Sequence, residues 1–170
     1  MTKDEILDAL EDEREKMLAA LDGLSDEEML DPTVADSWSV KDIIAHLNAW
    51  EAELVRMLWQ LLQGSKPSTV QLSGESIDER NAQWQALYKN RPLEAVLEDY
   101  QAVRQQTLRR VDQFSEAELN NPAKYPALRG IPLWKWIAED SFEHEAEHLS
   151  DIIRWKDQRT PRDSAGPVDR

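Results

Sequence analysis

The chain has 170 residues and a formal net charge of −14, from 34 acidic and 20 basic residues. Nucleic-acid binding depends on Lys and Arg that neutralise phosphates, so this surplus of acid argues against a nucleic-acid partner. The absence of cysteine excludes disulfides, thiolate ligands and a cysteine nucleophile, so any sulfur chemistry needs an external thiol.

Hydrophobic residues make up 41% of the chain and charged residues 32%, which is typical of a folded globular protein. No apolar run approaches the ~20 residues of a membrane-spanning helix, and the first residues lack the pattern of a signal peptide. We therefore expect no membrane partner and a cytoplasmic location.

Apolar residues recur at the helical period in nearly every long segment, and no stretch alternates as a strand does. The first helix is expected over residues 2–22, where Thr2 and Glu5 form a capping box. A second capping box predicts a short helix at 25–28, which Pro32 ends.

The second long helix is expected from Ser39 to about Gly64. Its inward stripe consists of Val40, Ile43, Leu47, Trp50, Leu54, Met57, Leu58 and Leu61. Residues 65–75 are rich in Ser, Gly and Pro, which predicts a loop, and a shorter helix is expected over 76–89.

Pro92 stands where a helix can begin, and the third long helix is predicted over 93–114. A helical turn follows at 115–118, and a segment with three prolines, residues 120–132, is expected to be a loop. The fourth long helix is expected as one element over 133–156.

Four long amphipathic helices predict an all-α fold, a four-helix bundle with short extra helices in the connecting loops. No repeat or linker divides the chain, so residues 1–158 are expected to form a single domain. Residues 159–170 are polar and are expected to form a flexible tail.

All three histidines of the chain fall on inward positions of the expected helices. His144 and His148 are one turn apart in the fourth long helix, and His46 lies on the second. An i, i+4 pair can share one metal ion, and a third imidazole leaves a position for water or substrate. The spacing therefore predicts a divalent metal site; histidines that hydrogen-bond in a wet pocket are the alternative.

The pattern from His144 to His148 also matches the H-E-x-x-H motif of zinc proteases, with Glu145 as the general base. Such proteases take a further Glu or His downstream, and none follows His148. The sheet that pairs with their substrates is also missing, so we reject this interpretation.

Residues 38–51 (WSVKDIIAHLNAWE) and 132–144 (PLWKWIAEDSFEH), followed by His148, resemble the DinB/YfiT-like superfamily of four-helix bundles. With residues 64–67 (GSKP) and the helix expected over 77–88, the chain is most similar to the ClbS/DfsB branch. The resemblance covers about residues 3–156.

The resemblance implies a zinc or nickel ion held by one histidine of the second helix and two of the last, here His46, His144 and His148. Relatives include S-transferases and isomerases that use bacillithiol or mycothiol, and a cyclopropane hydrolase that disarms a genotoxin. It therefore implies a hydrolase or thiol S-transferase for a small electrophile, with a low-molecular-weight thiol as one partner, and a homodimer. Relatives often have Tyr at the position of Glu145, a departure that bears on substrate preference or on nothing.

Two carboxylates are candidate catalytic groups because they are close to the histidines in sequence. Asp140 precedes His144 by one turn, and Glu51 follows His46 by five residues. Solvated or helix-pairing carboxylates are the alternative. The candidate walls of an apolar substrate pocket are Trp38, Trp50, Trp134 and Trp136, although tryptophans at helical spacing are often core residues.

A second function remains open from the sequence. The same cavity suits a protein that binds or sequesters a small molecule, or protects against stress, without catalysis.

Overall fold

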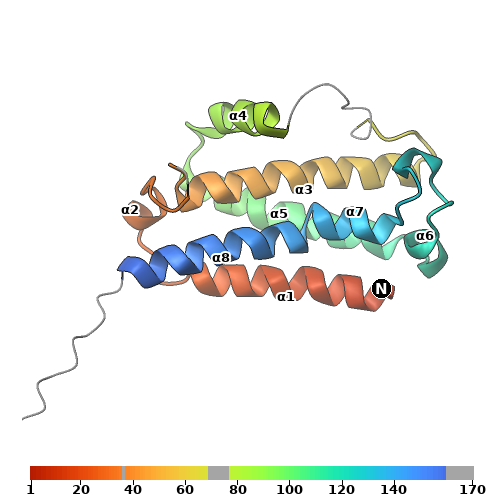
Figure 1. Cartoon of the computed structure of the whole chain (residues 1–170), viewed down its shortest axis with the longest axis horizontal. Helices are drawn as coiled ribbons and strands as arrows, with labels where there is room; N and C mark the ends of the chain where they lie inside the picture. The colour runs from red at the N-terminus through yellow and green to blue at the C-terminus, as the bar shows by residue number, and fades with distance from the viewer. Residues whose placement is uncertain (36, 69–76, 160–170) are drawn as a thin grey trace, which may run out of the picture.

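The computed structural model describes residues 1–35, 37–68 and 77–159. The regular elements within these residues are all helices. Long helical segments run side by side in Figure 1, which confirms the expected all-α four-helix bundle. These segments are α1 (Lys3–Leu21), α3 (Val40–Leu62), α5 (Leu93–Asp112), and α7 (Leu133–Glu139) followed by α8 (Phe142–Arg159). α3 packs mainly on α5, and α8 packs mainly on α1.

Short helices lie in the connections: α2 (Asp26–Met29), α4 (Ile77–Tyr88) and α6 (Glu116–Asn120). α4 runs along the outside of the bundle beside α3 and has no fully buried residue. A 3-10 turn at Pro126–Leu128 lies in the segment expected to be a loop.

Parts of three expected segments lie outside the described residues. They are residues 69–75 of the loop, Ser76 at the start of the helix expected over 76–89, and residues 160–170 of the tail. Arg159, expected to begin the tail, is the last residue of α8.

Capping boxes fix where four helices begin, and the first two of them were expected from the sequence. In each box the cap hydroxyl accepts from the backbone N–H three residues on, and the acid there accepts from the cap N–H. The pairs are Thr2 with Glu5, Ser25 with Glu28, Ser39 with Asp42 and Ser115 with Glu118. Each cap contributes about 1 kcal/mol to the stability of its helix.

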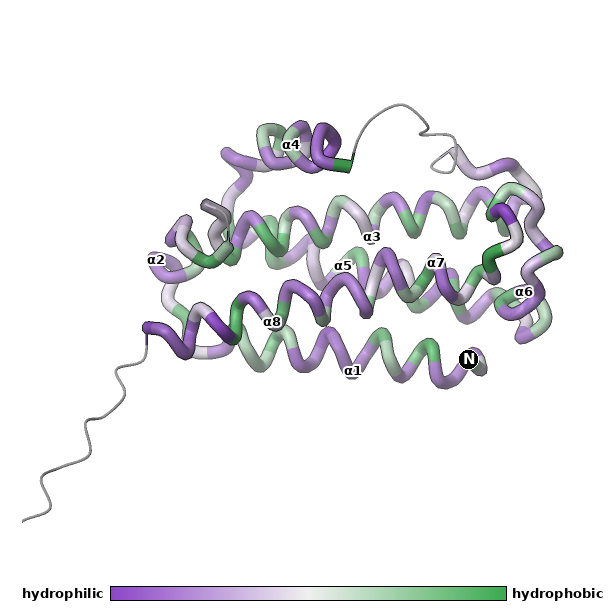
Figure 2. The backbone as a smooth tube through the Cα atoms, viewed as in Figure 1, coloured by the Kyte–Doolittle hydropathy of each residue, from purple (hydrophilic) through white to green (hydrophobic). Residues whose placement is uncertain are grey.

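The apolar core consists of two clusters of buried residues along the bundle. Figure 2 shows hydrophobic and hydrophilic residues alternating along the long helices, as amphipathic helices require. One cluster includes Met17, Ile43 and Tyr100, and the other includes Leu10 and Leu54. Between these apolar positions, α1, α3 and α5 each carry a buried charged residue.

The prediction of one continuous fourth helix over 133–156 is wrong, because α7 ends at Glu139 and α8 begins at Phe142. The Ser141 hydroxyl donates to the carbonyl of Ile137, and Asp140 has non-helical dihedral angles (φ −92°, ψ 4°). A serine that bonds back to the preceding turn in this way bends helices. The break therefore lies one turn before the first histidine of α8.

None of the described helices combines the length and apolar character that a membrane crossing needs.

Candidate metal centre

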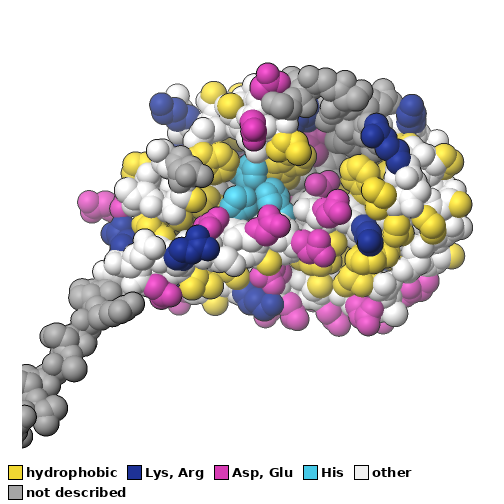
Figure 3. Space-filling view, in the orientation of Figure 1, with side chains coloured by type: hydrophobic (Ala, Val, Ile, Leu, Met, Phe, Trp, Pro, Cys, Tyr) yellow, Lys and Arg dark blue, Asp and Glu magenta, His cyan; other side chains and the backbone are white. Residues whose placement is uncertain are grey.

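The three histidines converge between α3 and α8. His46 comes from α3, and His144 and His148 come from the first half of α8. One ligand nitrogen from each lies within 4.8 Å of the other two, and the Nε2 atoms of His46 and His144 are 3.0 Å apart. Figure 3 shows the histidine side chains in cyan, gathered in a hollow of the surface.

Burial keeps these imidazoles neutral at pH 7. It lowers the pKa of His46 to about 3 and that of His144 to about 4, and neighbouring histidines add to both shifts. Burial also lowers the pKa of His148. Neutral imidazole is the form that binds metal ions, so no proton has to be removed first.

The donor set fits a divalent transition metal. The Nδ1 atoms of His46 and His148 are buried without a hydrogen-bond partner among the described residues, and Asp151 Oδ2 lies 3.7 Å from His148 Nδ1. A carboxylate near the far nitrogen of a ligating histidine orients the ring. Three neutral imidazoles beside a cavity are a ligand set for zinc or nickel with a position left open.

A cavity of about 640 Å³ adjoins the histidines, a volume that suits a small molecule. Trp38, Trp50 and Trp136 line it, and the rings of Trp38 and Trp50 meet His46 edge-on. Trp136 Nε1 is a buried donor without an acceptor among the described residues. The remaining lining residues are Ala35, Ile43, Ile77, Asn81, Glu139, Asp140 and Asp151.

Asp140 lies on the wall of this cavity, as its position before His144 suggested. Burial raises its pKa to about 7, and the negative charges of Glu139 and Glu53 add to the shift. A carboxyl group with this pKa can both accept and donate a proton near neutral pH.

Two other residues proposed for the site do not line the cavity. Trp134 packs against the apolar cluster that includes Leu10 and Leu54, with the Lys135 ammonium 5.7 Å from its ring centroid. Glu51 is 2% exposed, and its carboxylate receives hydrogen bonds from Arg14, Arg104 and Thr107. These saturated contacts leave Glu51 without a free oxygen for proton transfer at the histidines.

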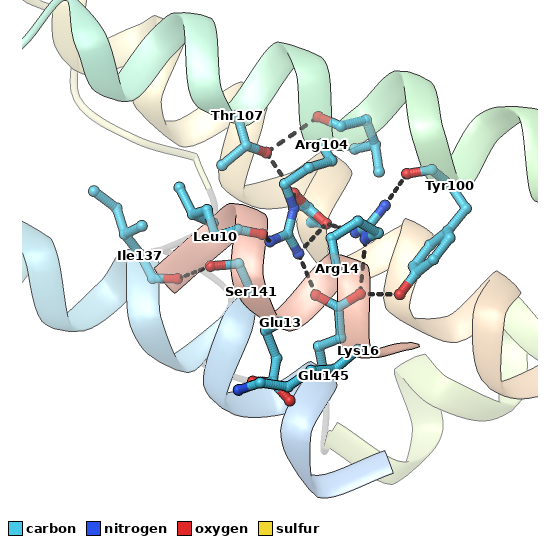
Figure 4. Close-up of polar contacts among 12 residues, drawn as sticks. Leu10, Glu13, Arg14, Lys16, Tyr100, Arg104, Thr107, Ile137, Ser141 and Glu145 are labelled. Carbon is cyan, nitrogen blue, oxygen red and sulfur yellow. Dashed lines mark hydrogen bonds and ion pairs between the residues drawn. The ribbon is translucent and has the colours of Figure 1, made fainter. Parts of the chain in front are cut away.

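A buried cluster of charges, which the sequence analysis did not identify, occupies the middle of the bundle (Figure 4). It joins Arg14 of α1, Glu51 of α3, Arg104 of α5 and Glu145 of α8, and the Tyr100 hydroxyl also donates to Glu145. Glu145 is 1% exposed and points into this cluster, away from the general-base role already rejected.

The sequence did contain a signal for this cluster. Arg14 falls four residues after Leu10 and three before Met17, so it occupies a position of the inward apolar stripe. Arg104 occupies the same kind of position between Tyr100 and Thr107. A charged residue on an apolar stripe predicts a buried partner, because an unpaired buried charge is strongly destabilising.

A family model described as the DinB superfamily matches residues 9–152 of the chain. A search of curated proteins found no match.

Several solved structures have the same fold. The structure named Sibling Lethal Factor Precursor, DfsB, aligns with a TM-score of 0.77 and 18% identity over 94% of this chain and 98% of that one. An uncharacterised protein from Escherichia coli UTI89 aligns with a TM-score of 0.77 and 16% identity over 92% and 94%. The colibactin self-resistance protein ClbS, crystallised in complex with dsDNA, aligns with a TM-score of 0.75 and 15% identity over 91% and 95%. DfsB and ClbS represent the branch that the motifs resemble, and at these identities the likeness concerns the fold.

The exclusion of a nucleic-acid partner from net charge is wrong, because ClbS shares this fold and was crystallised with dsDNA. Net charge sums the whole surface, whereas contact with phosphates depends on the local arrangement of cations. Lys66 and Lys124 line a second cavity, of about 620 Å³, whose described lining contains no carboxylate. The acidic total therefore coexists with a hollow whose own lining is basic, although the Lys124 ammonium also pairs with Glu118, 3.2 Å away.

Proposed function

The chain belongs to the DinB superfamily, and from that premise we propose that it is a metal-dependent enzyme acting on a small electrophilic molecule, as a hydrolase or thiol S-transferase. The observation that carries the proposal is the approach of His46, His144 and His148 to within 4.8 Å, at the wall of a cavity of about 640 Å³. These three residues would hold zinc or nickel.

A bound divalent ion would lower the pKa of a coordinated water or thiol, which supplies a nucleophile at neutral pH. Asp140 holds or releases a proton at its carboxyl group near the same pH, since its pKa is about 7. Asp151, with its carboxylate 3.7 Å from His148 Nδ1, would orient the His148 ring when a metal is bound, and Trp38 and Trp50 supply apolar surface for the substrate. These roles need no contribution from Glu51.

The charge of the cavity wall favours neutral or cationic substrates. Glu139, Asp140 and Asp151 line it, and its described lining contains no Lys or Arg.

Metal content is the direct test of this function. Protein purified without a histidine tag should contain about one zinc or nickel ion per chain by elemental analysis, and His148→Ala should contain almost none. If wild-type protein stays metal-free after zinc and nickel are added, the proposal of a metal-dependent enzyme is overturned.

The non-enzymatic alternative uses the same cavity to sequester a small molecule. Turnover separates the two functions: an enzyme consumes many equivalents of an electrophile, whereas a sequestering protein stops at the concentration of its sites.

The homodimer implied by the resemblance and the single domain over 1–158 also remain predictions. Sedimentation analysis tests the dimer.

DNA binding is a second candidate function, supported by the crystallisation of ClbS with dsDNA. In this chain the hollow lined by Lys66 and Lys124 is the described surface best suited to phosphates. Because this hollow and the histidine cavity have no lining residue in common among the described residues, the two functions can be tested separately.

A further inference from the structure

The histidine cluster spans the boundary between two pairs of helices. α3 packs mainly on α5, α8 packs mainly on α1, and direct packing between α3 and α8 is sparse. His46 belongs to the first pair, whereas His144 and His148 belong to the second. The distance between the ligands therefore depends on what holds the two pairs together.

The four buried charges cross this boundary from both sides. Arg14 lies 2.8 Å from Glu51 (Nη2 to Oε2) and 2.7 Å from Glu145 (Nε to Oε1). Arg104 lies 2.8 Å from Glu51 (Nε to Oε1) and 2.6 Å from Glu145 (Nη2 to Oε2). Each arginine thus ties α3 to α8, one from α1 and the other from α5 (Figure 4).

Backbone contacts fix the guanidinium groups further. Arg14 donates to the carbonyl of Tyr100 on α5, and Arg104 donates to the carbonyl of Leu10 on α1. The charged side chains of the cluster are at most 5% exposed, so water cannot replace a broken contact. Sliding one helix pair along the other would break several charge-assisted bonds at once.

The glutamates of the cluster are close in sequence to the histidines but face another way. Glu145 directly follows His144, and successive residues of a helix point about 100° apart. Glu145 accordingly lies in the core while His144 lines the cavity. Glu51 follows His46 on α3 and is likewise buried in the cluster. The relative placement of these two glutamates is therefore coupled to that of the histidines.

We propose that Arg14, Glu51, Arg104 and Glu145 are positioning residues of the histidine site, holding α3 and α8 in the register at which the three imidazoles reach one ion. The inference rests on the proposed metal site. A cluster with a merely structural role would change the stability of the bundle, whereas a positioning cluster changes metal affinity beyond what the loss of stability explains.

Arg104→Lys tests this distinction, because it keeps the charge on α5 but removes the planar group that bridges both glutamates. Arg104 does not line the histidine cavity. We expect zinc affinity, measured by chelator competition, to fall about tenfold, and the visible spectrum of the cobalt-loaded protein to change. The control is Phe114→Leu, a buried residue of the cluster that includes Leu10, chosen to give a comparable loss of melting temperature. Equal zinc affinity in both variants would overturn the proposal.

Milder variants keep the test decisive if Arg104→Lys does not fold. Thr107→Val and Tyr100→Phe each remove one hydroxyl that donates to Glu51 or Glu145, and both leave the charges in place. Their combination should weaken zinc binding several-fold. An unchanged zinc affinity together with an unchanged cobalt spectrum would count against a positioning role.

If wild-type protein binds no metal, the proposed function fails, but positioning can still be tested. The register of α3 against α8 is then measured by the nuclear Overhauser effect between the His46 and His144 rings. Loss of that signal in the folded variant supports positioning, and its persistence contradicts it.

Discussion

The Nε2 atoms of His46 and His144 lie 3.0 Å apart, although 98 positions separate these residues in the chain. Two neutral imidazoles approach this closely when they share a proton or bind a common ion. Because His148 adds a third nitrogen within 4.8 Å, the arrangement suits an ion better than an isolated hydrogen bond.

Removal of one histidine should abolish stable metal binding. His46→Ala leaves only the pair on α8, and two imidazoles hold zinc much more weakly than three. Arg56→Ala is the matched control because Arg56 is an exposed residue of α3, the helix that carries His46, and does not line the cavity. Isothermal titration with zinc should show binding in wild type and control but not in His46→Ala; undiminished affinity in that variant would exclude a shared site.

Asp140→Asn should stabilise the metal-free protein at neutral and higher pH. The pKa of Asp140 is about 7 in the folded protein, against an ordinary value of 3.8. Between these values the folded protein keeps a proton that the unfolded chain has lost, so wild-type stability falls as pH rises, by up to about 1.4 kcal/mol per pH unit. Asparagine does not titrate, so the variant escapes this loss.

Urea unfolding at several pH values measures the difference in stability between wild type and Asp140→Asn. We expect it to be small near pH 4, to grow as pH rises and to level off above about pH 7. Glu143→Gln, an exposed change on α8, should show no such growth. A difference in stability that is constant over this range contradicts the raised pKa of Asp140.

The bundle could be predicted from the sequence because local capping residues mark where its helices begin. Ser39 and Asp42, for example, form a capping box that starts α3 where the apolar stripe begins. The convergence of His144 and His148 follows from spacing on one helix, which is a local property. The position of His46 against them depends on packing, but its inward face was readable from its neighbours.

The features that the sequence analysis missed depend on partners distant in the chain or on a single competing bond. The environment of Glu51 is determined by its contacts with Arg14 and Arg104, which lie 37 and 53 positions away in the chain. Its proximity to His46 in sequence pointed to the wrong environment. The break before α8 coincides with a hydrogen bond from one hydroxyl, that of Ser141, to the carbonyl of Ile137 in the preceding turn. The helical pattern of apolar residues does not reveal such a bond, because Ser141 also fits an inward position of a continuous helix.

Ligand charge should control binding in the histidine cavity. Benzyltrimethylammonium, which cannot coordinate a metal, should bind more tightly than benzoate to the metal-free protein, by roughly tenfold or ~1.4 kcal/mol, because the described lining is acidic. Glu139→Gln should reduce this preference. Glu143→Gln makes the same change in net charge outside the cavity and should leave the preference intact. Quenching of tryptophan fluorescence reports binding, and equal effects of the two variants would assign the preference to net charge alone.

We expect double-stranded DNA to bind at the basic hollow, where Lys66 and Lys124 would contact its phosphates. Replacing both lysines by glutamate places like charges near the phosphates, so the affinity should fall for all sequences alike, and the slope of log affinity against log salt should drop by roughly two. Lys16→Glu is the control, since Lys16 is exposed on α1 and pairs with Glu13. Fluorescence anisotropy with a labelled duplex, recorded from low to physiological salt, measures both quantities. A double variant that binds as tightly as wild type and with the same salt dependence would rule out this hollow as the DNA surface. Zinc binding in the double variant should be unaffected, because the described linings of the two cavities have no residue in common.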